Sequence, residues 1–178
     1  DGVDQISETL ARVSGIDAIH LVSHGDGSGI RLGNTMLTAE SAAGYAGELA
    51  QWAGSLDEGA DLLIYGCDLA STSEGKDLIS MLATVCDCDV AASDDLTGHS
   101  SLGGDWDLEY AVGTIDTGVI FSEQLQQDWY GTLATITVDT LTDENDGDTS
   151  SIANLIASSG GTGISLREAI IAANNTAG

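Results

Sequence analysis

The chain contains no proline, and only four of its 178 residues are lysine or arginine. Without proline, the turns depend on glycine, and the 23 glycines of the sequence supply the backbone freedom that turns require. The shortage of basic residues matters more, because 29 aspartates and glutamates leave a formal net charge of −25. Nucleic acid and anionic membrane surfaces would be repelled by this charge, so we expect neither as a partner.

Long apolar runs are missing as well. No stretch of 18 apolar residues occurs, so the sequence predicts no membrane-spanning helix and no membrane insertion. Hydrophobic residues nevertheless make up 42% of the chain, which excludes a disordered acidic tail. We expect a folded protein whose anionic surface suits a saline or calcium-containing medium, where cations screen the self-repulsion.

A signal peptide is also missing, since the sequence opens directly with Asp1 and Gly2. We therefore expect the chain to be an internal piece of a longer exported protein whose export signal is encoded elsewhere. The acidic composition favours an extracellular setting for that protein.

Cysteine is scarce, and the three present form an odd number that cannot pair completely within the chain. Cys86 and Cys88 are too close in sequence for an ordinary disulfide, which leaves Cys67 as a predicted free thiol. The Cys86 and Cys88 spacing could also suggest a metal site. Without a second pair that signal is weak, and packing at a helix end is the favoured interpretation.

Apolar residues recur in patterns that alternate between helix and strand. The predicted helices cover residues 3–14, 39–53, 75–85 and 123–129, the predicted strands cover residues 18–22, 61–65, 89–93 and 106–110, and a hairpin covers residues 30–37. Thr38 and Ser122 are the expected N-caps of two of these helices, with Glu40 or Ser41 as rival start signals for the first of them. Strands that alternate with helices predict a three-layer α/β/α sandwich with a mainly parallel sheet.

Two of the predicted strands end in residues with reactive side chains. His24 follows the first strand and Cys67 follows the second, and in parallel sheets the ligand crevice lies beyond the carboxyl ends of the strands. An imidazole beside a thiol can remove its proton and later protonate a leaving group, which is chemistry that cleaves acyl bonds. Gly25 leaves room for a substrate backbone, and its amide and that of Cys67 are candidates for an oxyanion hole.

Each of these residues also has a structural interpretation. A free cysteine at a strand end is commonly a small buried hydrophobe, and only the matching position of His24 favours a reactive pair. His20 lies within an apolar run and is expected in the core. His99 lies in a polar loop and is expected to be solvated.

The order of these motifs resembles the superfamily of cysteine peptidases that includes caspases, gingipains, separase and clostripain. In those families a His-Gly pair and then a cysteine each follow a parallel strand. The resemblance implies a caspase-like fold with His24 as general acid and base and Cys67 as the nucleophile. It also implies an acidic residue in the specificity pocket of members that cleave after arginine or lysine, and Asp68, Asp94 and Asp95 are the candidates.

Those three aspartates have a simpler interpretation as loop residues that cap helices and turns. Trp106 is a candidate for the pocket wall, and core packing is its alternative. The dyad itself requires no cofactor.

A closer resemblance covers about residues 1–131. The sequence is similar to a domain of unknown function called DUF4347, found near the start of very large bacterial surface adhesins. The motifs that carry the resemblance are, in order, the segments 20–25 (HLVSHG), 65–70 (YGCDLA), 92–98 (ASDDLTG) and 103–109 (GGDWDLE). It implies a further strand before Asp1 and places the protein at a bacterial cell surface.

After Leu133 the composition changes, so we predict one domain at residues 1–132 and a second segment at 133–178. The second segment contains a predicted strand at 135–140, an acidic stretch rich in glycine and serine, and a helix at 166–174 with Ser165 as its cap. Its Ser165 to Ala169 motif resembles the CSLREA-type segment that opens β-helix surface proteins, although Ile164 replaces the leading cysteine. The resemblance implies the start of a truncated adhesive stalk.

The acidic stretch of this segment is a candidate calcium site. Its oxygen-bearing residues are Asp143, Asn145, Asp146 and Asp148. They do not match the complete twelve-residue calcium loop, so an acidic solvated loop is the alternative.

These observations lead to three functional hypotheses. The first is a cysteine endopeptidase that uses His24 and Cys67 on a polypeptide substrate, its own chain included, with cleavage in or beyond the linker after Leu133. The second is a non-catalytic cap or binding module of an adhesin that keeps the peptidase scaffold. The third is calcium-dependent adhesion through the acidic surface.

Overall fold

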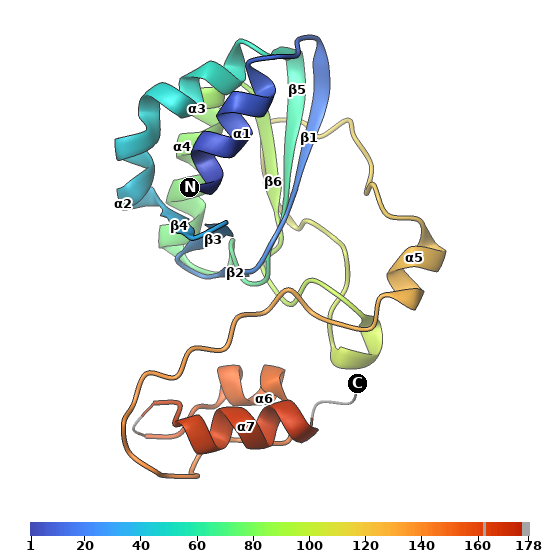
Figure 1. Ribbon diagram of the computed structural model, residues 1–178. Helices are drawn as coiled ribbons and strands as arrows, with labels where there is room; N and C mark the ends of the chain where they lie inside the picture. Colours follow the sequence, from blue (N-terminus) through green and yellow to red (C-terminus); the bar gives the residue numbers. More distant parts are fainter. Residues whose placement is uncertain (162, 176–178) are drawn as a thin grey trace.

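The computed structural model describes residues 1–161 and 163–175. Its centre is a four-stranded sheet with the order β1-β5-β6-β7, formed by Ile16–Val22, Leu56–Tyr65, Asp89–Ala92 and Tyr110–Val112 (Figure 1). The first three strands are parallel, and the edge strand β7 is antiparallel to β6. The prediction of a mainly parallel sheet is confirmed.

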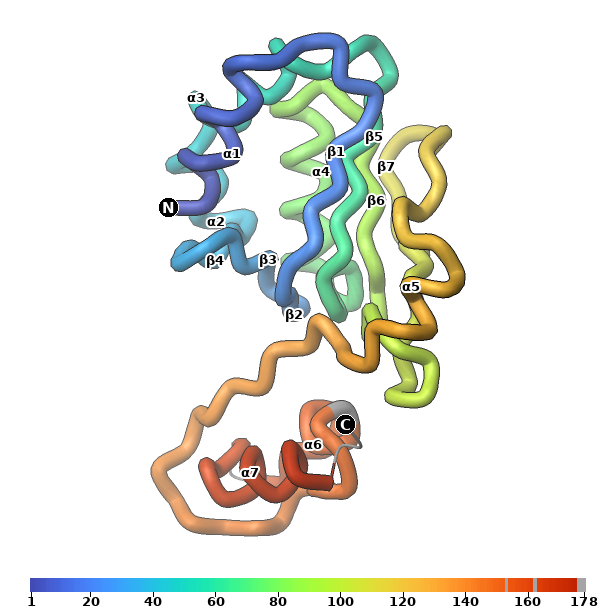
Figure 2. Tube along the Cα trace, turned by 45° about the vertical axis from the view of Figure 1, so that its right-hand side comes forward, coloured from blue at the N-terminus to red at the C-terminus, as the bar shows by residue number. Residues whose placement is uncertain are grey.

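Helices and irregular chain enclose this sheet on both sides. One face carries α1 (Gly2–Leu10), α2 (Ala39–Ala42), α3 (Ala46–Ala53) and α4 (Ser73–Cys86). The chain that follows β6 crosses to the other face and includes α5 (Glu123–Asp128), as Figure 2 shows. The molecule is therefore a three-layer α/β/α sandwich, as the alternation of elements predicts.

Strand β5 explains how two apolar clusters form on opposite faces. Side chains alternate across a strand, and every residue of β5 from Ala60 to Tyr65 is buried. Leu62 and Ile64 belong to the main core under the helices, whereas Leu63 and Tyr65 belong to the cluster on the other face. Cys67 belongs to that second cluster as well.

A small second sheet lies beside the ends of the main strands. It consists of β2 (Gly25–Asp26), β3 (Gly29–Leu32) and β4 (Thr35–Thr38), all antiparallel. The turn between β3 and β4 contains Gly33 with a φ of +63°, a conformation that glycine adopts without strain. This sheet confirms the predicted hairpin.

Two predicted helices differ from the structure in extent. Helix α1 ends at Leu10, and Val13 lies outside it with half of its surface exposed. The predicted helix at 39–53 is divided into α2, a 3₁₀ turn (Ala43–Tyr45) and α3. Its predicted cap is confirmed, because Thr38 and Ser41 form a reciprocal capping box.

Two predicted strands are wrong. Residues 106–109 alternate between buried and less buried positions, but the hydrogen-bonded ladder begins only at Tyr110. Residues 135–140 form no strand, because the Asp139 amide instead bonds the Ile164 carbonyl at 3.1 Å. Alternation therefore indicated which side chains face inward, but the position of a partner strand decides where a ladder forms.

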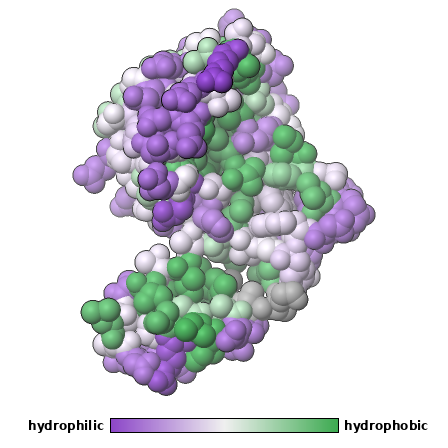
Figure 3. Space-filling model, in the orientation of Figure 1, coloured by the Kyte–Doolittle hydropathy of each residue, from purple (hydrophilic) through white to green (hydrophobic). Residues whose placement is uncertain are grey.

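The C-terminal segment forms its own small cluster. Helix α6 (Ile152–Ala157), which periodicity did not predict, packs against α7 (Leu166–Asn175). Ser165 caps α7 as predicted, since its hydroxyl accepts the Glu168 amide at 3.2 Å. Hydrophobic residues gather on the visible face of this unit, whereas hydrophilic residues dominate the surface over α1 and α2 (Figure 3).

None of the helices in the described part of the chain is both long and apolar enough to cross a bilayer.

Candidate functional site

The loops that carry His24 and Cys67 are neighbours at one edge of the sheet. Strands β1 and β5 run parallel, and their last paired residues are Val22 and Tyr65, two positions before each reactive residue. Gly25 lies against the second loop so closely that a Cβ atom there would come within 3.0 Å of the Gly66 carbonyl carbon. The absence of a side chain at Gly25 therefore allows the two loops to meet.

The Cys67 thiol is completely buried in this edge. The Thr97 amide donates to its sulfur at 3.2 Å, and the thiol faces the Thr97 carbonyl oxygen at 3.5 Å. The pKa of Cys67 is raised to about 11, mainly by burial and also by the charge of Asp68, while the hydrogen bond from the Thr97 backbone acts in the opposite direction. At neutral pH this thiol is protonated, so a nucleophilic thiolate requires a base.

The His24 ring bonds the linker. Its Nδ1 atom lies 3.0 Å from the Leu133 carbonyl oxygen. Because a carbonyl oxygen can only accept, Nδ1 carries the proton in this arrangement. The Leu133 backbone thus bonds His24, and the Leu133 side chain belongs to the same apolar cluster as Cys67.

Residues 131–134 cross the site as an extended strand. On one side Ala134 forms a parallel bridge with Gly25, and on the other Thr132 forms an antiparallel bridge with Gly98. The Leu133 amide donates to the Thr97 carbonyl at 2.9 Å. Figure 1 shows this segment passing below the ends of β1 and β5.

Gly98 makes this crossing sterically feasible. Its φ is +147°, and an added Cβ atom would lie 2.4 Å from the Gly131 carbonyl oxygen. Sequence reasoning missed both Thr97 and Leu133 as site residues. His24 and Leu133 are 109 positions apart, and no local pattern carries information about such a contact.

The predicted pocket aspartates occupy the same edge but differ in their surroundings. Asp68 adopts a left-handed conformation with φ of 59°, and burial, Asp26 and Asp94 raise its pKa. Asp68 and Asp95 line a cavity of about 470 Å³ that also reaches Gly25. The Asp94 amide bonds Glu109 at 3.0 Å. Acidic side chains therefore lie near the reactive loops, whereas their role in specificity stays a prediction.

An acidic cluster that the sequence analysis did not single out surrounds Asp95. Within the described residues, two groups have carboxylate oxygens close enough to share a cation, and both are exposed: Asp94, Asp95 and Glu109, and Asp105, Asp107 and Glu109. The alternation of acidic and apolar residues at 105–109 was the available signal, since it places these acids on one outward face.

Trp106 packs against the reactive edge. It is 7% exposed and belongs to the apolar cluster with Leu63, Tyr65, Cys67 and Leu133. Its ring meets that of Phe121 with centroids 4.6 Å apart. The two interpretations of Trp106, core residue and pocket wall, are therefore compatible.

The predicted calcium residues lie far along the chain in the C-terminal unit. Asp143 pairs with Arg167, Asp146 accepts the Gly161 amide at 3.0 Å, and Asp148 accepts the Ser150 amide at 3.1 Å. Asn145 lies in the same loop. These contacts organise the loop itself, and calcium binding there stays a prediction.

The remaining histidines have structural contacts. His20 Nδ1 lies 3.3 Å from the Tyr65 hydroxyl, and burial lowers the pKa of His20. His99 donates through Nε2 to the Gln127 carbonyl at 3.0 Å while Nδ1 accepts the Ser101 amide. His99 therefore joins two segments, which a solvated loop residue would not do.

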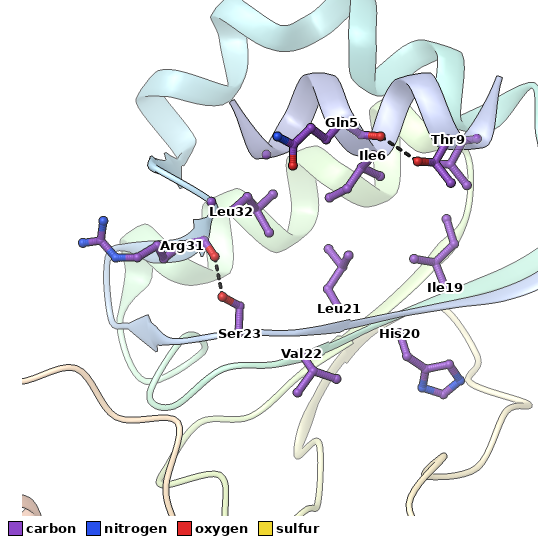
Figure 4. A pocket seen from close by; sticks show the side chains of 13 residues that line it. Gln5, Ile6, Thr9, Ile19, His20, Leu21, Val22, Ser23, Arg31 and Leu32 are labelled. Carbon is purple, nitrogen blue, oxygen red and sulfur yellow. Dashed lines mark hydrogen bonds between the residues drawn. The ribbon is translucent and has the colours of Figure 1, made fainter.

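Cys86 and Cys88 and a groove beside α1 lie apart from the site. Cys86 and Cys88 are both buried at the end of α4, where the Cys86 thiol donates to the Leu49 carbonyl, in agreement with helix-end packing. A cavity of about 440 Å³ lies between α1 and the edge strand β1. In Figure 4, Leu21 points into this cavity, whereas His20 and Val22 point to the opposite face of the strand.

Comparison with protein families gives one match. The model of the family described as Domain of unknown function (DUF4347) matches residues 1–133, so the chain belongs to this family. The match ends at Leu133, the residue that His24 bonds. No curated protein and no solved structure matches the chain.

Proposed function

We propose that this DUF4347 domain is a caspase-like cysteine endopeptidase that uses His24 and Cys67 as its catalytic pair and cleaves its own chain. The observation that carries the proposal is the position of the Leu133 backbone, whose carbonyl accepts from His24 while its amide donates to Thr97, the residue whose own amide bonds the Cys67 sulfur. A peptide carbonyl that is hydrogen-bonded to an imidazole, in a segment that packs beside a thiol, supports acyl cleavage.

The chemistry follows from the groups present. The Cys67 thiol transfers its proton to the imidazole, and the sulfur attacks a peptide carbonyl carbon to form a tetrahedral oxyanion. The amides of Gly25 and Cys67 are the proposed donors to that oxyanion. Collapse breaks the carbon–nitrogen bond, His24 gives its proton to the departing amine, and a thioester remains on Cys67. Water, deprotonated by His24, hydrolyses the thioester and restores the thiol.

The raised pKa of Cys67 fits a general-base mechanism better than a permanent ion pair. With the pKa at about 11, the thiol is protonated at neutral pH while the linker lies across the site. The imidazole must therefore remove the proton as the sulfur attacks. Such a site stays unreactive toward other electrophiles while the linker covers it.

An attached substrate reaches the site at a high effective concentration. We propose on this basis that the domain processes a larger surface protein, an adhesin that is exposed at a bacterial cell surface. The strongly acidic composition supports an extracellular setting, and no metal or organic cofactor enters the proposed steps.

The test compares the wild-type chain with Cys67→Ala and with His24→Ala during incubation under reducing conditions, with and without calcium. We expect two fragments from the wild type and none from either variant, as measured by intact-protein mass spectrometry. Cys86→Ala is the matched control, because this cysteine is also buried but lies away from the site. A wild-type chain that stays intact under all conditions would argue against autoprocessing.

A second candidate function is a non-catalytic binding module, and the complete burial of the Cys67 thiol favours it. The two functions differ in the reactivity of Cys67. A peptidase whose linker has been cut should be labelled by peptidyl acyloxymethyl ketones at Cys67, in a way that His24→Ala abolishes. A binding module would show no such labelling.

A further inference from the structure

The segment that crosses the site presents one side chain inward. Leu133 is 7% exposed, whereas its neighbours Thr132 and Ala134 are only partly buried. Its side chain belongs to the apolar cluster formed with Leu63, Tyr65, Cys67 and Trp106. The thiol of Cys67 is therefore part of the same apolar surroundings as the Leu133 side chain.

The backbone on either side of Leu133 is held as an added strand. Thr132 forms a β-bridge with Gly98, and Ala134 forms one with Gly25 of β2. Between them, the Leu133 amide donates to the Thr97 carbonyl. Peptides that bind enzymes and adaptor domains as extended strands use the same combination, in which backbone bonds give affinity and a pocket for every second side chain gives specificity.

The resemblance to peptidases that cleave after basic residues led us to expect an acidic pocket. The acidic residues near the site face a different space, since Asp68 and Asp95 line a cavity together with Thr135 and Ile156, beyond Ala134. The side chain of Leu133 packs in an apolar cluster, and a charged side chain in place of Leu133 would lose its hydration there.

From these observations we infer that the segment Thr132–Ala134 occupies the peptide-binding cleft as an internal substrate, and that the enzyme recognises leucine directly before the scissile bond, Leu133–Ala134. This inference rests on the proposed function and adds its specificity and its first cleavage site. Cleavage there would release residues 134–178, including the unit of α6 and α7, from the domain that the family model covers.

His24 also helps to determine which peptide bond of the segment is positioned for cleavage, in addition to its proposed role in proton transfer. Its Nδ1–H donates to the Leu133 carbonyl, and a hydrogen bond to a carbonyl oxygen withdraws electrons from the carbon that the sulfur attacks. Two residues earlier in the segment, the carbonyl has a different partner, since the Gly131 oxygen accepts the His99 amide at 2.9 Å. The bond after Leu133 is thus the one presented to the pair.

The first experiment locates the cut and varies the leucine. Mass spectrometry of the incubated wild type should show Leu133 as a new C-terminus and Ala134 as a new N-terminus. Leu133→Met should be cut at a similar rate, and Leu133→Arg and Leu133→Asp should be cut roughly tenfold or more slowly. A cut at another bond, or an equal rate for Leu133→Arg, would overturn the inference and leave the proposed function standing.

The second experiment does not depend on catalysis. Alkylation of Cys67 by iodoacetamide, mapped by peptide mass spectrometry, should be roughly tenfold or more faster in Leu133→Asp than in the wild type, because the segment no longer covers the thiol. Val138→Asp is the control, since Val138 is 42% exposed and lies outside the cleft. Equal rates for wild type and Leu133→Asp, with thermal unfolding confirming that both are folded, would show that the segment does not occupy the cleft.

The two failures are distinguishable. An intact wild-type chain whose Leu133→Asp variant gains Cys67 reactivity would reject the peptidase and the cleavage site, yet would show that the cleft holds this leucine. A chain cut by Cys67 at another bond would reject the leucine assignment alone.

Discussion

Asp95 carries a carboxyl group that its surroundings disfavour in the charged form. Burial raises the pKa of Asp95 to about 6, and Asp105, Glu109 and Asp94 contribute by like-charge repulsion. Since the folded pKa lies above the unfolded value, the group stabilises the fold below about pH 3.8, and this contribution is lost as the pH rises through 6. Above pH 6 the ionised carboxylate is a net cost to the folded state.

Asp95→Asn should therefore stabilise the protein at pH 8 and have little effect at pH 3.5. Because the Asp95 side chain is exposed, solvent screens much of the repulsion that it experiences. We therefore expect the substitution to raise the free energy of unfolding at pH 8 by about 1 kcal/mol, which corresponds to roughly 2–4 °C in Tm for a chain of this size. Thermal unfolding at both pH values measures the difference. Asp17→Asn, an exposed aspartate on β1, is the control. A Tm gain that is the same at pH 3.5 and pH 8 would contradict the electrostatic explanation.

Single residues also show which part of the site the sequence could predict. His24 and Cys67 were found because each directly follows a buried strand, so their shared edge follows from the rule for parallel sheets. Leu133 and Thr97 could not be found in this way. Their contacts join segments far apart in the chain, and only the folded path of residues 113–131 around the second face brings Leu133 to the site.

At the scale of elements, the C-terminal unit depends on one buried carboxylate. Glu168 accepts the backbone amides of Ser165, Asp146 and Gly147 at 2.8, 2.9 and 2.8 Å. These hydrogen bonds lower the pKa of Glu168 to about 2. A single side chain thus holds the start of α7 to the acidic loop before α6.

Glu168→Gln should loosen this unit. A glutamine has one oxygen and an NH₂ group, so it cannot accept all three amides, and amide exchange in residues 144–175 should become roughly tenfold faster. The domain at 1–133 provides the internal control within the same sample. The lowered pKa of Glu168 gives a second measurement, the pH dependence of stability. The contribution of the ionised Glu168 carboxylate to the stability of the unit is complete above about pH 4.5 and is lost as the pH falls through 2. Unchanged exchange in Glu168→Gln would show that the carboxylate is not what orders the loop.

Elements were predictable where their signals were local. Strands β1 and β5 each end in a short, mainly apolar stretch before a turn. Thr38, Ser122 and Ser165 bond backbone amides that follow them, so these helix starts follow from neighbouring residues. The strand predicted at 135–140 failed for the opposite reason. Its β-branched residues favour extended backbone, but a strand also needs a partner edge, and none pairs with it among the described residues.

At the scale of the whole molecule, the net charge predicts that folding stability depends on salt. A formal net charge of −25 on 178 residues makes the compact state repel itself, and unfolding relieves that repulsion by separating the charges. Salt shortens the screening length from about 10 Å at 0.1 M to about 3 Å at 1 M. Screening therefore stabilises the folded state more than the expanded one.

We expect the Tm to rise by several degrees between 0.05 and about 1 M sodium chloride, and by a similar amount in potassium chloride. Calcium chloride at matched ionic strength separates screening from binding, since the exposed clusters around Glu109 would add a concentration-dependent gain only if they hold the cation. A Tm that stays flat or falls with sodium chloride would mean that local packing, and not self-repulsion, limits stability. In the proposed setting such a dependence would keep the domain folded in a saline medium, where the linker is held in the cleft.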